Sequence, residues 1–225
     1  IRCNGSNNGS AQVNASGGNA PYTYTWNPSG GSGSLATGLS PGNYTVIIRD
    51  DNGCTTTAST SITQPVALVL TTTPTNILCN GLSNGSISSV LTGGTAGYNY
   101  SWSPSGGNTA NASGLAPGSY TLTATDANGC TITSTASITQ PAPLTLAVTG
   151  NTDVLCFGGN TGAATVAGSG GTGNLTYTWS PGSIQGTNAS NLVARNYTIT
   201  LTDANGCSRT ISTVITQPTP LAANL

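Results

Sequence analysis

Four kinds of residue are missing from this sequence of 225 residues: it contains no lysine, glutamate, histidine or methionine. Charged residues make up only 4% of the chain, and they are four arginines and five aspartates. Because no basic patch is present to displace counterions from a phosphate backbone, nucleic acid is not expected as a partner. The scarcity of charge also excludes the highly charged type of disordered chain.

Catalysis and membrane insertion find no support in the same composition. General acid–base catalysis usually depends on histidine, glutamate, lysine or a tuned pair of carboxylates. The first three are absent and the aspartates stand mostly singly at equivalent turns, so we predict that the chain is not an enzyme and uses no cofactor or metal. No apolar run approaches the ~20 residues of a membrane-spanning helix, so no span is expected in this part of the protein.

What the sequence does contain is a threefold internal repeat. The steps between successive tryptophans are 76 and 77 residues, at Trp26, Trp102 and Trp179. The phrase Ile-Thr-Gln-Pro recurs with them and closes each repeat. The predicted domains are a first repeat without its first strand at 1–65, a complete second repeat at 66–141, a third repeat at 142–218 and the first strand of a following repeat at 219–225. Since residue 1 falls inside a repeat, we expect the chain to be part of a longer array.

The most regular stretch of each repeat begins with a tyrosine and ends with an Asn-Gly pair and a cysteine. In the second repeat it runs from Tyr120 to Cys130, and the tyrosine recurs as Tyr44 and Tyr197. Because side chains alternate across a strand, the tyrosine and the apolar residues after it share one face and the threonines share the other. The Asn-Gly pair tolerates positive φ and predicts a hairpin into the next strand.

Six short strands separated by turn residues are expected in the complete repeat. Their predicted spans are 66–71, 86–91, 98–102, 109–115, 120–125 and 130–139, and the fourth is the weakest. No segment shows a helical period of useful length. The pattern predicts an all-β chain of tandem immunoglobulin-like antiparallel β-sandwiches. The Gln-Pro pairs between repeats predict stiff connections, because proline restricts itself and its predecessor to extended backbone.

The six cysteines fall into three pairs with a constant separation of 51 residues. The pairs are Cys3 with Cys54, Cys79 with Cys130, and Cys156 with Cys207. An even number of cysteines at regular spacing in small Gly/Thr/Ser-rich domains predicts disulfides and an oxidising compartment. Zinc would need clustered Cys and His ligands, and there is no histidine. Reduced buried thiols remain the other alternative.

The strand topology determines which cysteines can pair. If the strands between Cys79 and Cys130 run up and down, the two cysteines meet at one end of the sandwich, and the constant separation favours this pairing within each repeat. If the weak strand instead crosses to the other sheet, the cysteines lie at opposite ends and the ~7 Å limit between Cα atoms forbids the bond. A third arrangement, Cys54 with Cys79 and Cys130 with Cys156, would join neighbouring repeats.

The aromatic residues are predicted to form the core of each repeat. The set comprises Trp26, Trp102, Trp179, Tyr44, Tyr120 and Tyr197. Little else in a repeat is large enough to fill a sandwich. The alternative is an aromatic platform for sugars on the strand that carries Tyr98, Tyr100 and Trp102, and exposure of Trp102 would distinguish the two.

Two polar features have both a functional and a structural interpretation. Threonines alternate on the strands at 120–125 and 130–139 and could bind ice or glycan, but threonine also favours an ordinary solvated β face. Asp126 and Asp203 precede their Asn-Gly turns and could bind calcium. One carboxylate per turn is a weak calcium signal, and a side-chain hydrogen bond within the turn explains the aspartate.

The combined motifs resemble a known repeat family. The order is Cys-Asn-Gly, Gly-Gly-x-x-x-Tyr-x-Tyr-x-Trp, Gly-Leu-x-Pro-Gly-x-Tyr-Thr, Asp-Ala-Asn-Gly-Cys and Ile-Thr-Gln-Pro. This order resembles the SprB-type repeat of giant surface adhesins in gliding Bacteroidetes. The third repeat departs from it at residues 192–196 and at Phe157. The resemblance implies a secreted, cell-surface, filament-forming adhesin linked to gliding motility and exported by the type IX system.

The residues themselves favour a mechanical role. A disulfide-linked, stiffly joined repeat array without catalytic groups is suited to be a spacer, stalk or fibre. Near-zero net charge removes repulsion between molecules, so we expect neighbouring repeats and further copies of the chain as partners. The alternative function is a glycan- or surface-binding β-sandwich module with a surface polysaccharide as its partner.

Overall fold

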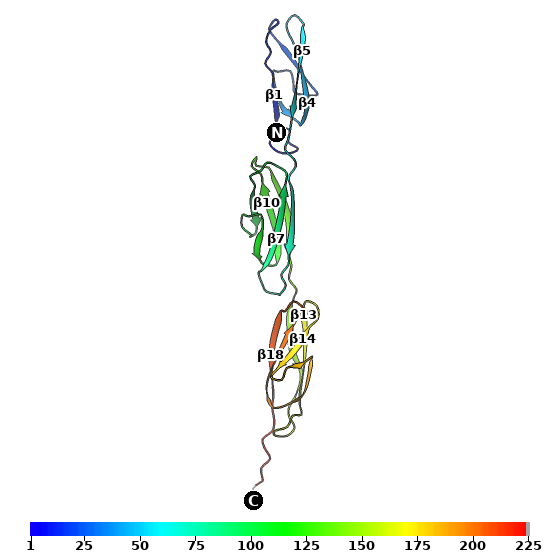
Figure 1. The fold of residues 1–225 in the computed structure, drawn as a ribbon, viewed down its shortest axis with the longest axis vertical. Helices are drawn as coiled ribbons and strands as arrows, with labels where there is room; N and C mark the ends of the chain where they lie inside the picture. The colour runs from blue at the N-terminus through cyan, green and yellow to red at the C-terminus, as the bar shows by residue number, and fades with distance from the viewer. Residues whose placement is uncertain (224–225) are drawn as a thin grey trace. The chain divides into compact units, whose positions relative to one another are not determined.

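A computed structural model describes residues 1–223, and every regular element in that range is a β-strand (Figure 1). The chain divides into two compact units. The first comprises residues 1–74, 87–113 and 119–136, and the second comprises 75–86, 114–118 and the residues from 137 onward. The boundary passes through the second sequence repeat, so each of the two links between repeats lies inside one unit.

Six strands form the second repeat. They are β6 (Val69–Thr75), β7 (Gly85–Thr92), β8 (Asn99–Ser103), β9 (Ala112–Leu115), β10 (Gly118–Thr125) and β11 (Thr131–Ile138). One sheet has the strand order β6-β7-β9 and the other β11-β10-β8. This is the division of strands A, B, E and C, F, G between the two sheets of an immunoglobulin sandwich. The predicted fold class is therefore confirmed.

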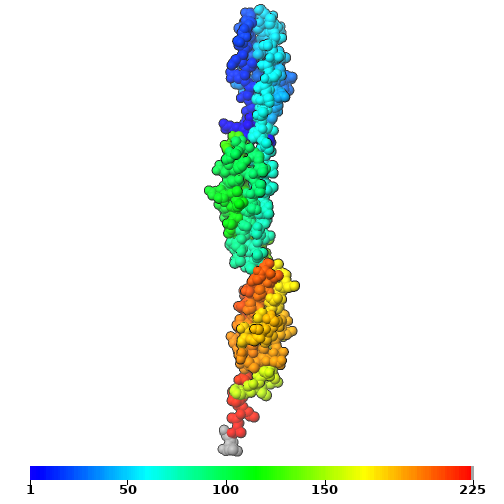
Figure 2. Space-filling view, in the orientation of Figure 1, coloured from blue at the N-terminus to red at the C-terminus, as the bar shows by residue number. Residues whose placement is uncertain are grey.

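The third repeat has the same plan with one extra short strand. Its strands are β12 (Ala142–Thr152), β13 (Gly162–Gly171), β14 (Thr176–Ser180), β15 (Ile184–Gln185), β16 (Asn188–Leu192), β17 (Arg195–Thr202) and β18 (Ser208–Ile215). The sheets have the orders β12-β13-β16 and β15-β14-β17-β18. The segment after β18, drawn in red, leaves the sandwich as an extended tail (Figures 1 and 2).

The first repeat contains five strands. They are β1 (Gly9–Gln12), β2 (Thr23–Asn27), β3 (Leu35–Leu39), β4 (Gly42–Arg49) and β5 (Thr55–Ile62). Its sheets are the two-stranded β1-β3 and the three-stranded β2-β4-β5. Strand β1 occupies the place of β7 and β13, but within residues 1–223 it pairs only with β3.

Strand alternation places the apolar residues in the cores. In β10, Tyr120, Leu122 and Ala124 are buried, and the threonines between them are partly exposed. Strand β8 pairs with β10 so that Trp102 lies opposite Leu122. The same register places Trp26 opposite Val46 in the first repeat and Trp179 opposite Ile199 in the third. The cores of the repeats are therefore built from equivalent residues.

The predicted hairpin is present between β10 and β11, but its turn differs from a two-residue Asn-Gly turn. Asp126 N donates to Cys130 O at 2.9 Å, and Gly129 N donates to Asp126 O at 3.0 Å. Only Gly129 of the Asn-Gly pair has positive φ, at 82°. The connection is thus a three-residue loop, in which glycine supplies the left-handed conformation after a type I turn. Asn128 keeps ordinary backbone and its side chain is free to bond elsewhere.

Candidate functional site: the disulfide junctions

Two disulfides join residues of consecutive repeats. Cys3 is bonded to Cys130 and Cys79 to Cys207, each with 5.6 Å between the Cα atoms. The predicted pairing within repeats is wrong, and so is the alternative that joined Cys54 to Cys79. Cys54 and Cys156 are exposed and have no disulfide partner within residues 1–223.

The position of the fourth strand explains why pairing within a repeat fails. In the third repeat β16 pairs with β13 and leaves the sheet of β14, β17 and β18, which is the crossover that forbids the bond. Cys207 directly precedes β18. Cys156 lies near the other end of β18, because Gly158, two residues after it, donates its backbone N–H to Oε1 of Gln217, which follows the strand. The eight residues of β18 separate the two cysteines by about 26 Å at 3.3 Å per residue, far above the disulfide limit.

A buried aspartate shapes the hairpin that presents each cysteine. Asp126 is 2% exposed, and its carboxylate accepts hydrogen bonds from Thr95 N, Asn128 N and Cys130 N, each at 2.9 Å. The bond from Thr95 is the largest cause that lowers the pKa of the Asp126 carboxyl, against the opposing effect of burial. The carboxylate therefore accepts the bonds within the turn that the structural interpretation expected, from Asn128 N and Cys130 N, and one more from Thr95 N outside the turn. Among residues 1–223 no cluster of three or more possible metal-ligating side chains occurs.

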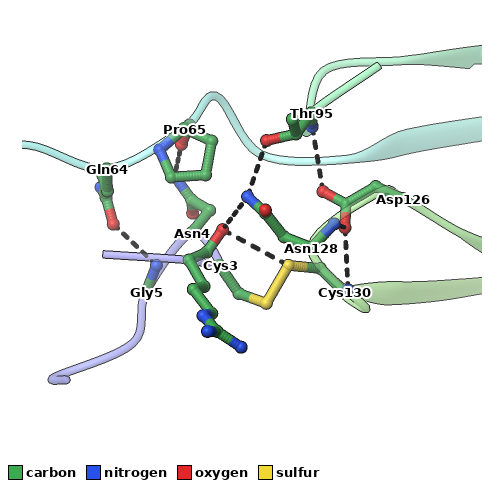
Figure 3. Close-up of a disulfide and its surroundings, with 10 residues drawn as sticks. Cys3, Asn4, Gly5, Gln64, Pro65, Thr95, Asp126, Asn128 and Cys130 are labelled. Atoms are coloured by element: carbon green, nitrogen blue, oxygen red, sulfur yellow. Dashed lines mark hydrogen bonds between the residues drawn. A yellow bond between two sulfur atoms is a disulfide. The ribbon is translucent and has the colours of Figure 1, made fainter. Parts of the chain in front are cut away.

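The first disulfide lies within a network of hydrogen bonds between the first and second repeats (Figure 3). Asn128 Nδ2 donates to Arg2 O at 3.0 Å and to Thr95 Oγ1 at 2.8 Å. The Asn side chain of the hairpin thus binds the backbone beside Cys3, and the disulfide closes the same contact covalently. The hairpin of the second repeat is fastened to the start of the first at two adjacent points.

The turn after Cys3 also holds the segment that links the two repeats (Figure 3). Gly5 N donates to Gln64 Oε1 at 2.7 Å, and Asn4 Nδ2 donates to Pro65 O at 2.9 Å. The Gln-Pro pair is therefore fixed by side chains as well as by the restricted backbone of proline. The Cys-Asn-Gly motif supplies all three partners: the sulfur, the amide and the backbone N–H.

The second junction repeats these contacts at equivalent positions. Gly81 N donates to Gln140 Oε1 at 2.8 Å, and Asn80 Nδ2 donates to Pro141 O at 2.9 Å. Asn205 Nδ2 donates to Leu78 O at 3.1 Å, beside the disulfide between Cys79 and Cys207. The two junctions belong to different compact units, so the arrangement recurs independently.

A leucine from the link packs against paired glycines near each hairpin. A Cβ atom on Gly94 would lie 2.6 Å from Leu68 Cδ2, and one on Gly93 would lie 1.9 Å from Ala67 O. Leu144 packs in the same way on Gly171 in the third repeat. Glycine is required at these positions because the incoming strand occupies the space of a side chain. Sequence reasoning treated Gly93 and Gly94 only as a turn and missed this contact.

The predicted core aromatics lie in the sandwiches. Trp102 is 6% exposed, and its indole Nε1 donates to Thr109 O at 3.0 Å. Trp26 and Trp179 are also buried, and their indole Nε1 groups donate to Gly33 O and Gly186 O respectively. The tyrosines Tyr44, Tyr120 and Tyr197 are also buried. A sugar platform that includes the tryptophans is therefore contradicted.

Comparison with known proteins gives a family for the sequence and neighbours for the fold. The sequence model of the SprB repeat matches residues 1–33, 71–107 and 145–184. No curated protein matches the chain. No helix among residues 1–223 is long and apolar enough to cross a membrane.

Several solved structures of multidomain proteins are similar at low identity. Three N-terminal domains of the outer capsid protein Hoc of bacteriophage RB49 have 13% identity and a TM-score of 0.41, and the match covers 89% of each chain. Titin domains I67–I69 have 12% identity and a TM-score of 0.44, with 90% of each chain covered. The eight N-terminal immunoglobulin domains of the Down syndrome cell adhesion molecule have 12% identity and a TM-score of 0.46, covering 88% of this chain and 33% of that one.

The three matched regions fall one in each sequence repeat, and each includes both the Cys-x-Gly turn and the strand of the buried tryptophan. They therefore contain one side of each junction and part of each core. The chain therefore carries three matches to the SprB repeat, one in each of its sequence repeats.

Proposed function

We propose that the chain is a load-bearing stalk segment of a secreted cell-surface adhesin, in which disulfides clamp each repeat to the next. The family match and the fold support a structural repeat module of the adhesin type. The observation that carries the mechanical role is the pairing of Cys3 with Cys130 and of Cys79 with Cys207. Each bond spans the link between two repeats, where a tandem array is otherwise joined by a single strand of chain.

The two bonds interlock, because each closes a loop that contains one cysteine of the other. The loops run from Cys3 to Cys130 and from Cys79 to Cys207, with separations of 127 and 128 residues. Tension applied at the ends passes through Cys3 to Cys130, back along the chain to Cys79, and across to Cys207. The second repeat therefore carries load along its 51-residue segment between cysteines, whereas most of the first and third repeats lies outside the shortest covalent path.

This path sets a limit on extension. Between Ile1 and Ala223 the shortest covalent path has 69 residue-to-residue steps, compared with 222 along the whole chain. Two of these steps lead from Ile1 to Cys3, 51 lead from Cys130 back to Cys79, and 16 lead from Cys207 to Ala223. At about 3.5 Å per residue, a fully unfolded oxidised chain reaches about 240 Å and a reduced chain about 780 Å. A stalk with this cross-linking keeps its repeats connected at short length even after they unfold.

The proposal also includes a location outside the cell and a role in surface attachment. Structural disulfides persist in oxidising surroundings, which supports a location outside the cell. The resemblance to gliding adhesins supports a role in surface attachment and gliding, with a surface polysaccharide as a candidate partner. The low charge of the chain suits a passive spacer that carries a binding end elsewhere in the molecule.

Single-molecule stretching tests the load path. With handles at both ends, the oxidised chain is expected to reach about 240 Å when fully unfolded, and addition of reductant is expected to release it to about 780 Å. The double variant Cys54→Ser, Cys156→Ser is the matched control, because it removes only the unpaired thiols and should leave both lengths unchanged. An oxidised chain that extends to the full length would overturn the proposal.

A further inference from the structure

The first junction disulfide joins cysteines that lie far apart in the sequence, although nearer cysteines are present. Cys130 is 127 residues from Cys3, and four other cysteines lie closer to Cys130 along the chain. The nearest is Cys156, at a separation of 26 residues. Because the probability of closing a flexible loop falls with about the three-halves power of its length, an unfolded chain favours Cys156 over Cys3 as the partner of Cys130 about tenfold. Chain entropy therefore does not select Cys3, and contacts of the folded chain must do so.

The second junction disulfide shows the same preference for a distant partner. Cys79 is bonded to Cys207 at a separation of 128 residues, whereas Cys54 is 25 residues away and Cys130 is 51 residues away. Loop closure in an unfolded chain favours Cys54 about tenfold and Cys130 about fourfold over Cys207. Both bonds thus form against the entropy of the chain, which requires that the cysteines are brought together before they react.

In each hairpin one carboxylate oxygen fixes the asparagine and the cysteine relative to each other. Asp126 Oδ1 accepts hydrogen bonds from both Asn128 N and Cys130 N, each at 2.9 Å. In the third repeat Asp203 Oδ1 accepts the equivalent two bonds, also at 2.9 Å. The two side chains that face the junction therefore leave the hairpin from fixed points.

The asparagine side chain and the cysteine sulfur of the first junction converge on one backbone carbonyl (Figure 3). Asn128 Nδ2 donates to Arg2 O at 3.0 Å, and Cys130 Sγ lies 3.5 Å from the same oxygen. Arg2 directly precedes Cys3 in the chain. A hydrogen bond from Asn128 to this carbonyl therefore places Cys130 beside Cys3 without any covalent bond.

The second junction has the same convergence at equivalent positions. Asn205 Nδ2 donates to Leu78 O at 3.1 Å, and Cys207 Sγ lies 3.3 Å from that oxygen. Leu78 directly precedes Cys79, as Arg2 precedes the first cysteine of the other junction. Arginine and leucine have unlike side chains, so the feature that both asparagines recognise is the backbone carbonyl. The arrangement occurs once in each compact unit, so it recurs independently.

The hairpin has the same shape where no disulfide is present. In the first repeat Asp50 Oδ1 accepts a hydrogen bond from Cys54 N at 2.8 Å, and Gly53 N donates to Asp50 O at 3.0 Å. Cys54 has no disulfide partner within residues 1–223. The turn that presents the asparagine and the cysteine therefore does not depend on the disulfide, so it can be in place before oxidation.

We propose that Asn128 and Asn205 are positioning residues for the formation of the two disulfides. Each asparagine docks its hairpin on the backbone carbonyl that precedes the partner cysteine, so the junction assembles first and the sulfurs are oxidised afterwards. In the first junction, the hydrogen bond from Asn128 selects Cys3 as the partner of Cys130. The covalent clamp follows a pairing that hydrogen bonds have already made.

The oxidation takes two exchange steps, with glutathione disulfide as the oxidant. The thiolate of Cys130 attacks one glutathione sulfur, which forms a mixed disulfide and releases one glutathione thiolate. The thiolate of Cys3 then attacks the Cys130 sulfur and releases the second glutathione thiolate. Two protein thiols are oxidised, and one glutathione disulfide is reduced to two thiols, which take up the two protons. Only the second step depends on Asn128, because only that step needs Cys3 beside Cys130.

This inference goes beyond the stalk proposal and can fail separately from it. Stretching follows the load path through disulfides that are already formed, whereas oxidation kinetics follow how those disulfides form. A chain whose extension is limited by its disulfides can still have acquired them without the asparagines. Conversely, asparagines can direct the pairing in a chain that carries no load.

Oxidative refolding of the full chain tests the positioning. The reduced, unfolded protein is returned to native buffer with reduced and oxidised glutathione, free thiols are alkylated at intervals, and each disulfide is quantified by peptide mass spectrometry. In Asn128→Ala, formation of the bond between Cys3 and Cys130 is expected to slow about fivefold, which corresponds to the loss of one hydrogen bond of ordinary strength. The disulfide of the second junction in the same molecules is the internal reference and keeps its rate. Asn205→Ala is expected to slow the second disulfide and leave the first unchanged.

Two further variants separate positioning from side-chain size and from general stability. Asn128→Asp keeps the shape of the side chain but removes the donor N–H, so it should slow the first disulfide at least as much as Asn128→Ala. Asn108→Ala makes the same truncation at an exposed asparagine between β8 and β9 and should change neither rate. The glutathione mixed disulfide of the first junction should accumulate in Asn128→Ala, because the first exchange step needs no docking.

Oxidation in a denaturant that unfolds the chain removes the docking altogether. Under that condition Cys130 should bond to Cys156 about tenfold more often than to Cys3, in the unmodified protein and in Asn128→Ala alike. Equal slowing of both disulfides in Asn128→Ala, an unchanged rate of the first disulfide in Asn128→Asp, or predominance of the bond between Cys3 and Cys130 in denaturant would each overturn the proposal.

Discussion

The first and second repeats build the same hairpin but bury it to different extents. Asp50 accepts hydrogen bonds from Asn19 N at 3.0 Å and Cys54 N at 2.8 Å, and Asp126 accepts the equivalent bonds from Thr95 N and Cys130 N. Asp126 is buried, whereas Asp50 is only half-buried. The same turn therefore forms in both repeats, and its greater burial in the second accompanies the segment at 66–68 that lies on Gly94, for which residues 1–223 supply no equivalent in the first repeat.

The last strand of each repeat shows the same difference. Strand β5 is exposed along nearly all its length, whereas β11 buries Ala136 and Ile138. In the second repeat Thr72 of β6 lies beside β11, with its hydroxyl 2.9 Å from that of Ser134. Strand β6 thus closes the side of the sandwich in the second repeat, whereas no strand among residues 1–223 does so in the first.

Loss of the disulfide between these two repeats should have the largest effect. Cys3→Ser opens a loop of 127 residues, and the chain-entropy treatment gives a loss of about 5 kcal/mol in the free energy of unfolding. Chemical denaturation of the oxidised protein measures it, and Cys54→Ser, which breaks no bond, is the control. A loss below about 1 kcal/mol would show that the two repeats are held together without the covalent bond.

Matched substitutions at equivalent glycines test the difference between the first and second repeats. Gly17→Ala and Gly93→Ala both place a Cβ on left-handed backbone, which costs about 1–2 kcal/mol in each case. At Gly93 the new atom also meets Ala67 O and displaces the incoming strand, whereas at Gly17 it meets open space. We expect Gly93→Ala to destabilise by about 2 kcal/mol more than Gly17→Ala in thermal unfolding. Equal losses would mean that the strand contact contributes nothing to the second repeat.

The hairpin aspartates predict the smallest effect, which is a dependence on pH. Hydrogen bonds from Thr95 N to Asp126 and from Asn19 N to Asp50 are the largest causes that lower the pKa of these carboxyls. A lowered pKa contributes stability that is fully present above the ordinary aspartate value of about 3.9 and is lost as the pH falls through the folded value. The free energy of unfolding should be level between about pH 7 and 5 and decline below about pH 4.

Single aspartate substitutions test whether these two carboxyls cause the loss of stability at low pH. Asp126→Asn should remove part of the decline when denaturation midpoints are compared across the pH series. Asp50→Asn should act in the same direction, because its carboxylate accepts equivalent bonds. An unchanged pH profile in both variants would place the acid-sensitive groups elsewhere.

Much of the fold could be predicted because it depends on neighbouring residues. Alternation of apolar residues and threonine placed β10 and β11 within about two residues of their observed limits. Predicted strand 66–71 begins later, at Val69, because residues 66–68 first cross the glycine pair, where Gly94 N donates to Val66 O. This contact joins residues about 27 positions apart, so the local alternation of apolar and polar residues does not predict it.

The cysteine pairing could not be obtained from spacing. The separation of 51 residues within repeats reflects the identical body of each repeat, and the bonded separations of 127 and 128 are equally regular. The one additional residue of the third repeat lies before Cys156, where the register of β12 against β13 shifts between Val148 and Gly150. Regular spacing therefore supports either pairing, and it does not show which cysteines come together.

The sequence by itself determined the repeat length, the strands, the hairpin with its aspartate and the aromatic core, since each depends on short-range periodicity or turn chemistry. Tertiary structure alone decided that the fourth strand joins β7 in place of β10, and this one choice sends the two cysteines of a repeat to opposite ends. Disulfide formation requires two Cα atoms within about 7 Å, a distance set by the packing of sheets and not by separation along the chain. For that reason the bonds that join the repeats became visible only in three dimensions.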